Sequence, residues 1–387
     1  MFDWMNRALG RETKTSAAKP LIALTFGGRA AWTPRDYGAL AREGFAKNPI
    51  AHRCVRVIAE AAASTPLVVR RGGQVREGDP AADLLARPNP DQSGAEFLES
   101  HFGYLQVAGN AYAELASIDG VPRELYALRP DRMRVLPGSR GWPDGWEYTI
   151  GGRAVRFVRD KASGRSPILH ARLFHPGDDH YGFSPLEAAA MAVDVHNAGG
   201  AWAKALLDNA ARPSGALVVT AKDGEGRLTD DQYEKLKAEL SELHTGPANA
   251  GRPLLLEGGL DWKPMALTPA DMDFIAARRE AAREIALAFG VPPMLLGLPG
   301  DNTYANYREA NLAFWRQTVL PLARKNAAAM TGWLRPWFGE DLDIVCDEDS
   351  LPALSEERAA RWARISTAEF LDSAEKRSLL GLPESSS

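Results

Sequence analysis

The sequence predicts an α+β fold in which long helices and a block of short strands occupy different parts of the chain. Two segments with helical periodicity, residues 184–211 and 268–290, enclose a short α/β insertion. A series of short β-prone segments fills much of residues 111–158. A third long helical pattern, interrupted by Pro321, follows near the C-terminus.

Length and composition describe a globular protein. The chain has 387 residues, enough for two or three units of ordinary domain size. Hydrophobic residues make up 45% and charged residues 25%, a balance that permits a buried core. The two cysteines, Cys54 and Cys346, are far apart, so we expect no disulfide framework and a reducing compartment. No apolar run approaches the ~20 residues of a membrane helix, and no secretory signal is expected.

The net charge of −4 conceals an uneven distribution. Residues 1–71 contain 12 Lys or Arg and 5 Asp or Glu, whereas residues 340–357 contain eight acids and no Lys or Arg. Tight binding along a DNA backbone depends on many phosphate contacts, so a DNA-coating protein would be more uniformly basic. If this chain handles DNA, we expect DNA to slide past it.

The N-terminal part predicts an arm, a helix and a hairpin. Residues 1–30 show no clear period and are expected to form a flexible arm. Asn48 followed by Pro49 is typical of an N-cap and the first position of a helix. Leu67–Arg71 predicts a strand that runs into a turn at Gly72-Gly73.

A second helix and a β-rich meander follow. Ser93 and Glu96 have the spacing of a capping box, and the helix that they open is expected to stop near Gly109. The next segments are short, β-prone and punctuated by Gly, Pro or Asp. The predicted strands are Ala111–Ser117, Arg123–Leu128, Met133–Leu136, Glu147–Ile150 and Ala154–Val158.

The helical segment 184–211 begins at another capping box, formed by Ser184 and Glu187. Its predicted face is rich in small residues, and Gly199-Gly200 near its middle weaken it by about 1 kcal/mol each. Small residues favour close packing against neighbouring helices. An ordinary core helix with a bend is the alternative interpretation.

The insertion, residues 212–267, predicts a small α/β unit. Strand candidates at Ala216–Thr220 and Pro253–Leu256 bracket a short acidic helix. Thr229 and Gln232 form the capping box that would open this helix.

The second long helical segment, 268–290, opens at a Thr-Pro pair. Gly290 is expected to supply its C-cap, and Pro292-Pro293 prevents continuation. A polar loop over residues 299–306 comes next, followed by a helical pattern from about Tyr307 to Phe338. Because a proline removes a backbone hydrogen bond, a kink is expected at Pro321 within this pattern.

No group of residues predicts catalysis. His170, His175 and His180 could form a metal site, but steps of five residues match neither one helix face nor the usual close ligand pairs. A loop with surface histidines is the alternative. Ser184 lacks the glycine pattern of a nucleophile elbow and is better explained as an N-cap. There is no P-loop motif, Cys54 is expected in the core, and no cofactor is predicted.

The polar loop leaves two interpretations open. Its side chains are those of Asn302, Thr303, Tyr304, Asn306 and Arg308. One interpretation is a surface loop with an N-cap at its end. The other is a loop that makes weak, sequence-independent hydrogen bonds to DNA phosphates.

Several stretches occur in an order and spacing that is typical of one protein family. They are NPIAHRCVRVIAEAAASTPL, LLARPNP, GNAYAEL, ILHAR, YGFSPLEAA, NAARPSGAL, EIALAFGVPPMLLG, NTYANYREANLAF and TVLPLA. Between about Asn48 and Pro383, the sequence resembles the HK97-like portal proteins of tailed phages. Its compact length and high Ala and Arg content also resemble the portal of a gene transfer agent, a phage-derived particle that packages host DNA.

The resemblance implies a portal-type subunit with defined parts. Residues 31–183 would form a β-rich wing, 184–211 and 268–290 two stem helices, and 212–267 a clip. Residues 291–340 would form the tunnel loop and a kinked wing helix, and 341–387 a short crown. The tunnel loop would bring Asn302, Thr303, Tyr304, Asn306 and Arg308 to the DNA channel.

The same resemblance implies the function and the partners. The chain would form a homo-oligomeric ring, typically of twelve subunits, at one capsid vertex. Double-stranded DNA would be packaged and ejected through it without sequence specificity and without enzymatic activity. The major capsid protein, the terminase large subunit and the head-tail adaptor would be partners, and no membrane is involved. The protein would be assembled in the cytoplasm of the bacterial host and reside in the virion.

Two other functions remain possible from the residues alone. One is a metal-dependent hydrolase that uses His170, His175 and His180. The other is a cytosolic scaffold or adaptor protein without a DNA channel.

Overall fold

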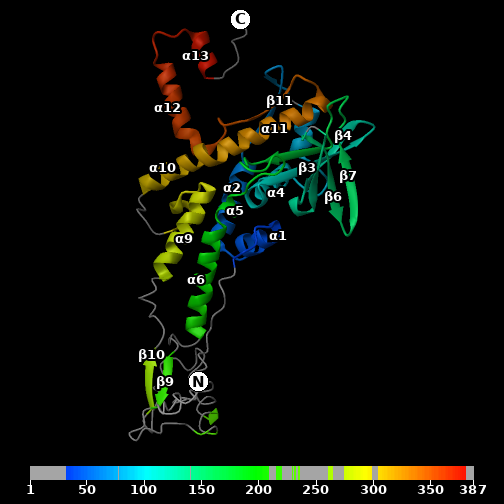
Figure 1. The fold of residues 1–387 in the computed structure, drawn as a ribbon. Coiled ribbons are helices and arrows are strands. Elements are labelled where there is room, and N and C mark those ends of the chain that lie inside the picture. The colour runs from blue at the N-terminus through cyan, green and yellow to red at the C-terminus, as the bar shows by residue number, and fades with distance from the viewer. Residues whose placement is uncertain are drawn as a thin grey trace, which may run out of the picture. The chain divides into compact units, whose positions relative to one another are not determined.

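The computed structural model combines helices with small antiparallel sheets, which confirms the α+β prediction (Figure 1). The structure describes residues 32–76, 78–139, 141–208, 215–219, 229, 231, 234–235, 260–264, 274–298 and 304–380. The predicted arm, residues 1–30, lies outside them. In this part of the chain, no helix is long and apolar enough to cross a membrane.

Two predicted helices form the centre of the main core. Helix α2 (Pro49–Ala63) is capped by Asn48, whose Oδ1 accepts from the backbone N–H groups of Ile50 and Ala51 at 3.0 Å each. Helix α4 (Gly94–Ala108) begins at the predicted capping box, with both reciprocal hydrogen bonds present. It ends at Gly109, where φ is 69°. Both helix starts and the stop of α4 are therefore confirmed.

Several short elements were not predicted, because they carry too few residues for a periodic signal. They are α1 (Tyr37–Leu40), the π-helical segment η1 (Ala41–Ala46), α3 (Pro80–Ala86) and η2 (Pro130–Arg132). Asp36 caps α1 and Asp79 caps α3 through their side chains.

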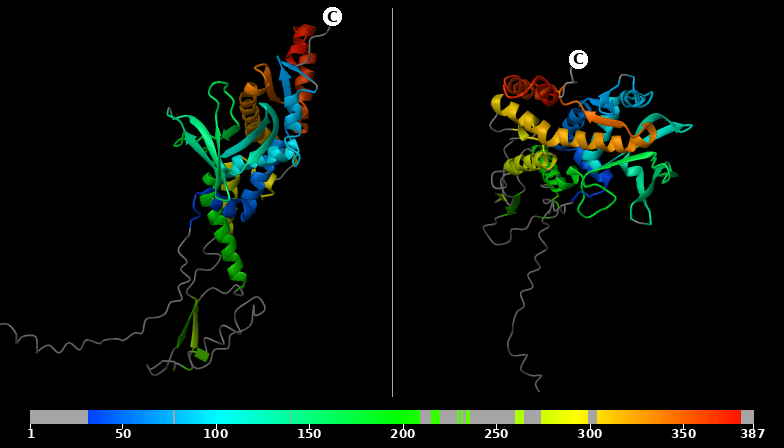
Figure 2. Two further views of the ribbon diagram at one scale, coloured as in Figure 1. Left: turned by 90° about the vertical axis from the view of Figure 1, so that its right-hand side faces the viewer. Right: turned by 90° about the horizontal axis from the view of Figure 1, so that it is seen from above.

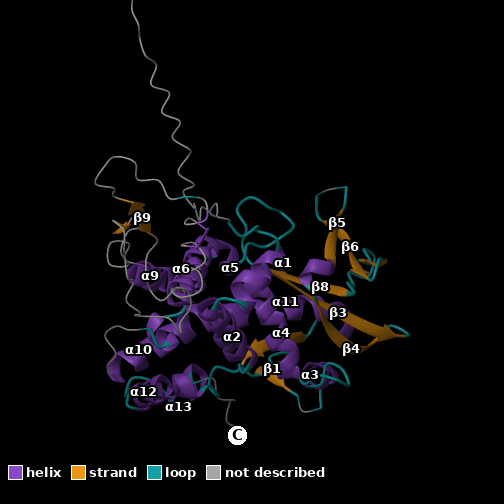
Figure 3. Cartoon of the chain, turned by 90° about the horizontal axis from the view of Figure 1, so that it is seen from below, coloured by secondary structure: helices purple, strands orange, loops and turns teal. Residues whose placement is uncertain are grey.

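The predicted meander is confirmed as two three-stranded antiparallel sheets (Figure 3). One has the order β4-β3-β8 and the other β5-β6-β7. The strands are β3 (Asn110–Ile118), β4 (Val121–Leu128), β5 (Met133–Pro137), β6 (Pro143–Ile150), β7 (Arg153–Val158) and β8 (Ile168–Arg172). Strand β8 was not predicted. A second, smaller core joins the two sheets, with Trp146 and Tyr112 almost fully buried in it.

A third sheet has the order β11-β1-β2. The predicted hairpin forms from β1 (Leu67–Arg71) and β2 (Gln74–Val75). The other neighbour of β1 is β11 (Leu342–Cys346), which pairs with it antiparallel over the full length. The predicted C-terminal segment, 341–387, therefore begins inside this sheet.

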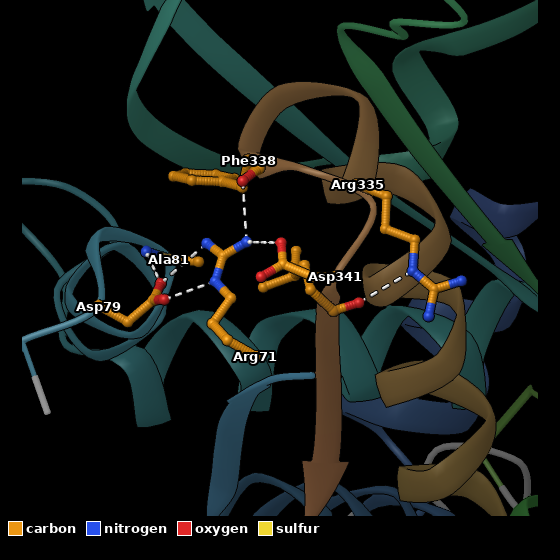
Figure 4. A network of polar contacts seen from close by, with 7 residues as sticks. Arg71, Asp79, Ala81, Arg335, Phe338 and Asp341 are labelled. Atoms are coloured by element: carbon orange, nitrogen blue, oxygen red, sulfur yellow. Dashed lines mark hydrogen bonds and ion pairs between the residues drawn. The ribbon is translucent and has the colours of Figure 1, made fainter. Parts of the chain in front are cut away.

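A polar network fastens this sheet to the helices around it (Figure 4). Arg71 Nε lies 2.7 Å from Asp79 Oδ2, at the start of α3. Its Nη1 donates to the carbonyl of Phe338 at 2.8 Å and lies 3.1 Å from Asp341 Oδ1. Arg335 donates from Nε to the carbonyl of Leu342 at 2.9 Å. One cluster thus ties β1, α3, β11 and the end of α11 together.

The helical segment 184–211 was predicted as one helix, and that prediction is wrong in one respect. Helix α5 (Pro185–Ala188) ends in a turn at Ala189, and α6 (Ala190–Asp208) follows. Leu186 is fully buried, and α5 packs on α4 and α9, whereas α6 continues along α9.

The insertion is described only in part. Strand β9 (Gly215–Val219) pairs antiparallel with β10 (Leu260–Pro264). Strand β10 was not predicted, and the predicted strand Pro253–Leu256 lies outside the described residues. Most of the helix predicted from Thr229 also lies outside them, as does the predicted start of the second long helix.

The long C-terminal helical pattern is interrupted where proline was expected to disturb it. Helix α10 (Tyr304–Phe314) passes into the π-helical segment η5 (Trp315–Val319) and then into α11 (Leu320–Phe338). Pro321 lies in the first turn of α11, so its missing N–H falls where the hydrogen-bond pattern has already changed. The start is at Tyr304 rather than Tyr307.

The remaining elements belong to the C-terminal part. After β11 come η6 (Pro352–Leu354), α12 (Ser355–Ser366) and α13 (Ser373–Leu379). We call the continuous run of α10, η5 and α11 the long helix. Strands β3–β7 lie near one end of it, and helices α12 and α13 lie near the other (Figure 2). Helix α11 packs on β11 and β8.

Candidate functional site

The turn that ends α9 (Phe274–Phe289) is the geometric centre of the candidate site. Gly290 has a φ of 66° and donates from its N–H to the carbonyl of Leu287 at 3.0 Å. Val291 donates to the carbonyl of Ala286 at 2.9 Å. This pair of bonds is a Schellman motif, which satisfies the last carbonyls of a helix. The predicted stop at Gly290 is confirmed.

The π-helical segment fixes this turn from the other side. Thr318, within η5, donates from Oγ1 to the carbonyl of Gly290 at 2.6 Å. A Cβ atom added at Gly290 would lie 2.9 Å from the Oγ1 atom of Thr318, which is closer than real Cβ atoms approach. Phe289, Val291 and Val319 are all nearly or fully buried beside the contact. The C-terminal end of α9 is therefore held against η5. The chain then continues into η4 (Pro293–Leu296).

The structure locates only part of the predicted channel group. Asn302 and Thr303 lie outside the described residues. Tyr304 and Asn306, expected in a loop, belong to the first turns of α10, so the prediction of a loop through residue 306 is wrong. Because α10 has 3.6 residues per turn, positions 304 and 308 share one face of the helix. Position 306 is rotated by about 200° around the helix axis from position 304. Asn306 and Arg308 are exposed.

Arg308 is engaged in ion pairs. Its Nη1 lies 3.3 Å from Glu356 Oε2 on α12, and its Nη2 lies 3.9 Å from Glu309 Oε1. The Arg308 side chain is 55% exposed and that of Glu356 75%, so water screens the pair strongly. Sequence reasoning missed Glu356 as a partner. The signal was present, because residues 340–357 hold acids without a single Lys or Arg.

A polar network joins α6 to α2 and α9. Asn48 donates from Nδ2 to Asn197 Oδ1 at 3.0 Å, and Asn197 donates to the carbonyl of Glu43 at 2.9 Å. Arg278 Nε donates to His196 Nε2 at 3.4 Å. Burial, followed by the Arg278 charge, lowers the pKa of His196. Sequence reasoning did not foresee this network, since its members are far apart along the chain.

The glycine pair in α6 lies opposite Arg278. A Cβ atom at either Gly199 or Gly200 would first meet the Arg278 side chain, at 3.8 Å in both cases. These are ordinary contact distances, so both positions leave room for a long side chain between α6 and α9. Helix α6 packs on α9, whereas the role of its small residues in close packing stays a prediction.

The three histidines do not form a metal site. His170 is a strand residue that stacks on Tyr112 with ring centroids 4.3 Å apart, so the surface-loop interpretation is wrong for it. Its Nε2 lies 3.0 Å from Asn110 Oδ1, and burial lowers its pKa to about 3. His175 Nδ1 instead accepts from the N–H of Gly177. Within the described ranges, no three His, Cys, Asp or Glu side chains are placed to hold a metal ion.

The other candidates for chemistry have structural roles. Ser184 is almost fully buried and accepts from the N–H of Glu187 at 2.9 Å, as an N-cap does. Cys54 is fully buried, and burial raises the pKa of its thiol to about 12, which disfavours the reactive thiolate. Both predictions are confirmed.

Comparison with known proteins decides the family. The family described as "Phage portal protein" matches residues 49–381. The chain belongs to this family. Portal proteins are structural assembly proteins that form the ring at a capsid vertex through which DNA passes. The resemblance to HK97-like portals that the sequence suggested is thus confirmed.

Individual relatives place the chain within the portal family. A chain from the neck of the native gene transfer agent (GTA) particle, determined with C12 symmetry, is 54% identical. The match covers 92% of this chain and 96% of that one, with a TM-score of 0.70. An uncharacterized protein of Rickettsia bellii is 44% identical over 88% of each chain. The portal protein of Enterobacteria phage HK97 is 26% identical over 78% of this chain and 70% of its own length.

Proposed function

We propose that the chain is the subunit of a twelve-membered portal ring at one vertex of a capsid of the gene-transfer-agent type. The observation that carries the proposal is the 54% identity, over 92% of the chain, with a protein from a GTA neck of C12 symmetry. Double-stranded DNA is packaged and ejected through this ring. Assembly takes place in the bacterial cytoplasm, and the ring contacts the major capsid protein in the finished particle.

The parts of the subunit have separate roles in this proposal. Residues 31–183 form the wing, and β11 joins it through its pairing with β1. Helices α5–α6 and α9 form the stem, which the contact between α6 and α9 supports. The insertion 212–267 is the clip, which binds the terminase large subunit during packaging and the head-tail adaptor afterwards. The crown is reduced to the residues after β11, chiefly α12 and α13.

The segment from the end of α9 to the first turns of α10 approaches the DNA. Asn302, Thr303, Tyr304, Asn306 and Arg308 are the proposed contacts. Amide, hydroxyl and phenol groups form hydrogen bonds with phosphate oxygens that carry no sequence information. The fixed turn at Gly290 supports this role, because it gives the segment a rigid base on η5. A single arginine that already has carboxylate partners guides DNA without holding it.

A triple substitution tests this function. Asn302→Ala, Tyr304→Ala and Arg308→Ala together should leave ring formation intact and reduce the nuclease-protected DNA per particle several-fold, because weak phosphate contacts are lost. Ring formation is measured by electron microscopy and protected DNA by quantitative PCR. Glu99→Gln, an exposed change on α4 that leaves Arg308 and its carboxylate partners unaltered, is the matched control. A normal DNA yield from the triple variant would refute the assignment of these residues.

A further inference from the structure

Three arginines lie at intervals of eight residues along the long helix. Arg308 is on α10, Arg316 on η5 and Arg324 on α11. Their side chains are 55%, 54% and 56% exposed, so each guanidinium is reachable from water. We call these three residues the arginine row. Spaced guanidinium groups of this kind are suited to binding successive phosphates of a nucleic acid backbone.

Each member of the row faces a glutamate from the C-terminal part. Arg308 pairs with Glu356 at 3.3 Å, and Arg316 Nε donates to Glu357 Oε2 at 3.1 Å. Arg324 forms two parallel hydrogen bonds with Glu348, both at 2.6 Å. The acidic stretch between residues 340 and 357 thus contributes the partners for the whole row.

The three pairs differ in how they are anchored. Glu348 follows β11, whose pairing with β1 holds it within a sheet. Glu356 and Glu357 occupy the first turn of α12, where no residue of the helix is buried. Helix α12 packs on α13 and on η6, the short helix that precedes it and that itself packs on α10. Two exposed ion pairs add direct side-chain contacts between α12 and the long helix.

We propose that α12 is a releasable cover on the arginine row. Glu356 and Glu357 neutralise Arg308 and Arg316 until DNA phosphates displace them, and α12 then leaves the long helix. The proposal rests on the proposed function, because it needs DNA to approach α10. It gives the short C-terminal segment a role, which is to limit how strongly the subunit binds DNA.

The energetics favour exchange over permanent contact. Exposed ion pairs change an equilibrium by at most about fivefold each, and salt at physiological strength screens them over about 8 Å. Phosphates in duplex DNA occur at high local density and release counterions when they meet an arginine. A phosphate can therefore replace a glutamate at little cost in free energy, and the glutamate can return once the DNA has passed.

Binding of a fluorescent 20-base-pair duplex to the purified full-length protein tests the cover. The variant Glu356→Gln/Glu357→Gln should bind more tightly than the wild type, by up to about fivefold for each pair removed. The logarithm of its affinity should fall more steeply with the logarithm of salt concentration, by about 0.9 for each arginine freed. Adding Arg308→Ala/Arg316→Ala should abolish both gains.

Hydrogen exchange provides a readout that does not depend on affinity. Residues 355–366 should exchange faster in Glu356→Gln/Glu357→Gln, and faster in the wild type once duplex DNA is added. Glu375→Gln is the matched control, since Glu375 is a first-turn acid of the neighbouring helix α13 and accepts from Asp372 rather than from the row. It should change neither affinity nor exchange at α12.

The outcomes separate the cover from the proposed function. If Glu356→Gln/Glu357→Gln binds DNA like Glu375→Gln, or if DNA leaves exchange at α12 unchanged, the cover is refuted. Loss of packaging in the triple variant would then still support the portal channel assignment. If instead the triple variant packages DNA normally while the double glutamine variant binds more tightly, the cover stands and the channel assignment fails.

Discussion

Arg71 joins three elements of the fold through one guanidinium group. Its side chain is only 10% exposed, and that of its partner Asp79 only 4%, so solvent screens the pair little. The hydrogen bond from Arg71 holds the pKa of Asp79 below its usual value. Removing one member of such a pair leaves the other charge buried without compensation, which is far more damaging than losing a surface pair.

Arg71→Ala should lower the free energy of unfolding at pH 7 by about 3 kcal/mol. Because the folded pKa of Asp79 lies below its unfolded value of about 3.9, the stabilisation is complete above that pH and disappears as the pH falls through the folded pKa. The difference between variant and wild type should therefore shrink below about pH 4. Urea titrations at pH 7 and pH 3 measure it. Arg56→Ala, which removes an exposed pair with Glu60, should cost less than about 1 kcal/mol.

His101 is a second buried group that links stability to pH. It is fully buried, its Nε2 lies 2.9 Å from Asn326 Oδ1, and burial lowers its pKa to about 4. Between about pH 6.5 and pH 4 the unfolded chain binds a proton that the folded chain does not. Stability should therefore fall as the pH is lowered through this window.

His101→Gln should make the free energy of unfolding depend less on pH in this window, by up to about 1.4 kcal/mol per pH unit. Unfolding by urea at pH 7, 6 and 5 gives the slope for each protein. Phe174→Ala, an exposed change in the loop after β8 that involves no titrating group, is the control and should keep the wild-type slope. Equal slopes for all three proteins would contradict the role assigned to His101.

At the scale of elements, the end of α9 and the π-helical segment η5 depend on each other. The Schellman motif fixes the direction of the chain after Phe289, and Thr318 holds the carbonyl of Gly290. A π-helical turn carries an additional residue compared with an α-helix, which changes the faces of the helix on either side of it. Pro321 follows at once, so the irregularity and the proline act at a single place.

Gly290→Ala and Gly297→Ala form a matched pair of substitutions. Both residues have a positive φ, 66° and 71°, so each alanine should cost roughly 1–2 kcal/mol of unfolding free energy. Only Gly290 has a close neighbour, Thr318, whereas a Cβ at Gly297 would meet nothing within 4 Å. Gly290→Ala should therefore cost about 1 kcal/mol more, through the lost hydrogen bond. In a Thr318→Ala background, which removes both the hydrogen bond and the close oxygen, this additional loss should vanish, and thermal unfolding would show it.

At the scale of the whole molecule, the subunit leaves apolar side chains exposed in several places. Trp142, Phe174, Leu287 and Phe370 are each more than two thirds exposed. A ring buries such surfaces between subunits and against its partners, which a monomer cannot do. The C12 symmetry of the related GTA neck sets the expected copy number.

The purified protein should form rings of about twelve 42.0 kDa subunits, with a central pore of ~20 Å or more to admit duplex DNA. Mass photometry gives the copy number and negative-stain electron microscopy gives the pore. Leu287→Glu, a change at an exposed position on α9, should reduce ring formation without unfolding the subunit. Discs without a pore, or a particle of two or three subunits at high protein concentration, would contradict the ring.

Local signals in the sequence predicted the fold where they were sufficient by themselves. The N-cap at Asn48, the capping box at Ser93 and the stop at Gly290 each depend on a few neighbouring residues, and each was correct. Strand β11 was missed because its pairing with β1 depends on residues far away in the chain. The break at Ala189 was missed because no proline or glycine marks it in the sequence.

The candidate site was predictable only in outline, because part of it depends on contacts between residues that are far apart in the chain. The resemblance to portal proteins located the segment after α9, and the exposure of Arg308 agrees with it. Its pairing with Glu356 could not be read from either sequence segment alone. Such contacts between distant surface groups leave no local pattern, although the concentration of acids near residue 350 was a sign that basic partners exist.

The pairing of β1 with β11 has a consequence for synthesis in the cell. Strand β1 leaves the ribosome well before the neighbour that completes its sheet, because β11 comes far later in the chain. Until then, one edge of β1 has unpaired backbone groups, and closing so long a loop is slow. A chain that stops before residue 342 therefore cannot close this sheet and keeps one edge of β1 open to wrong pairing.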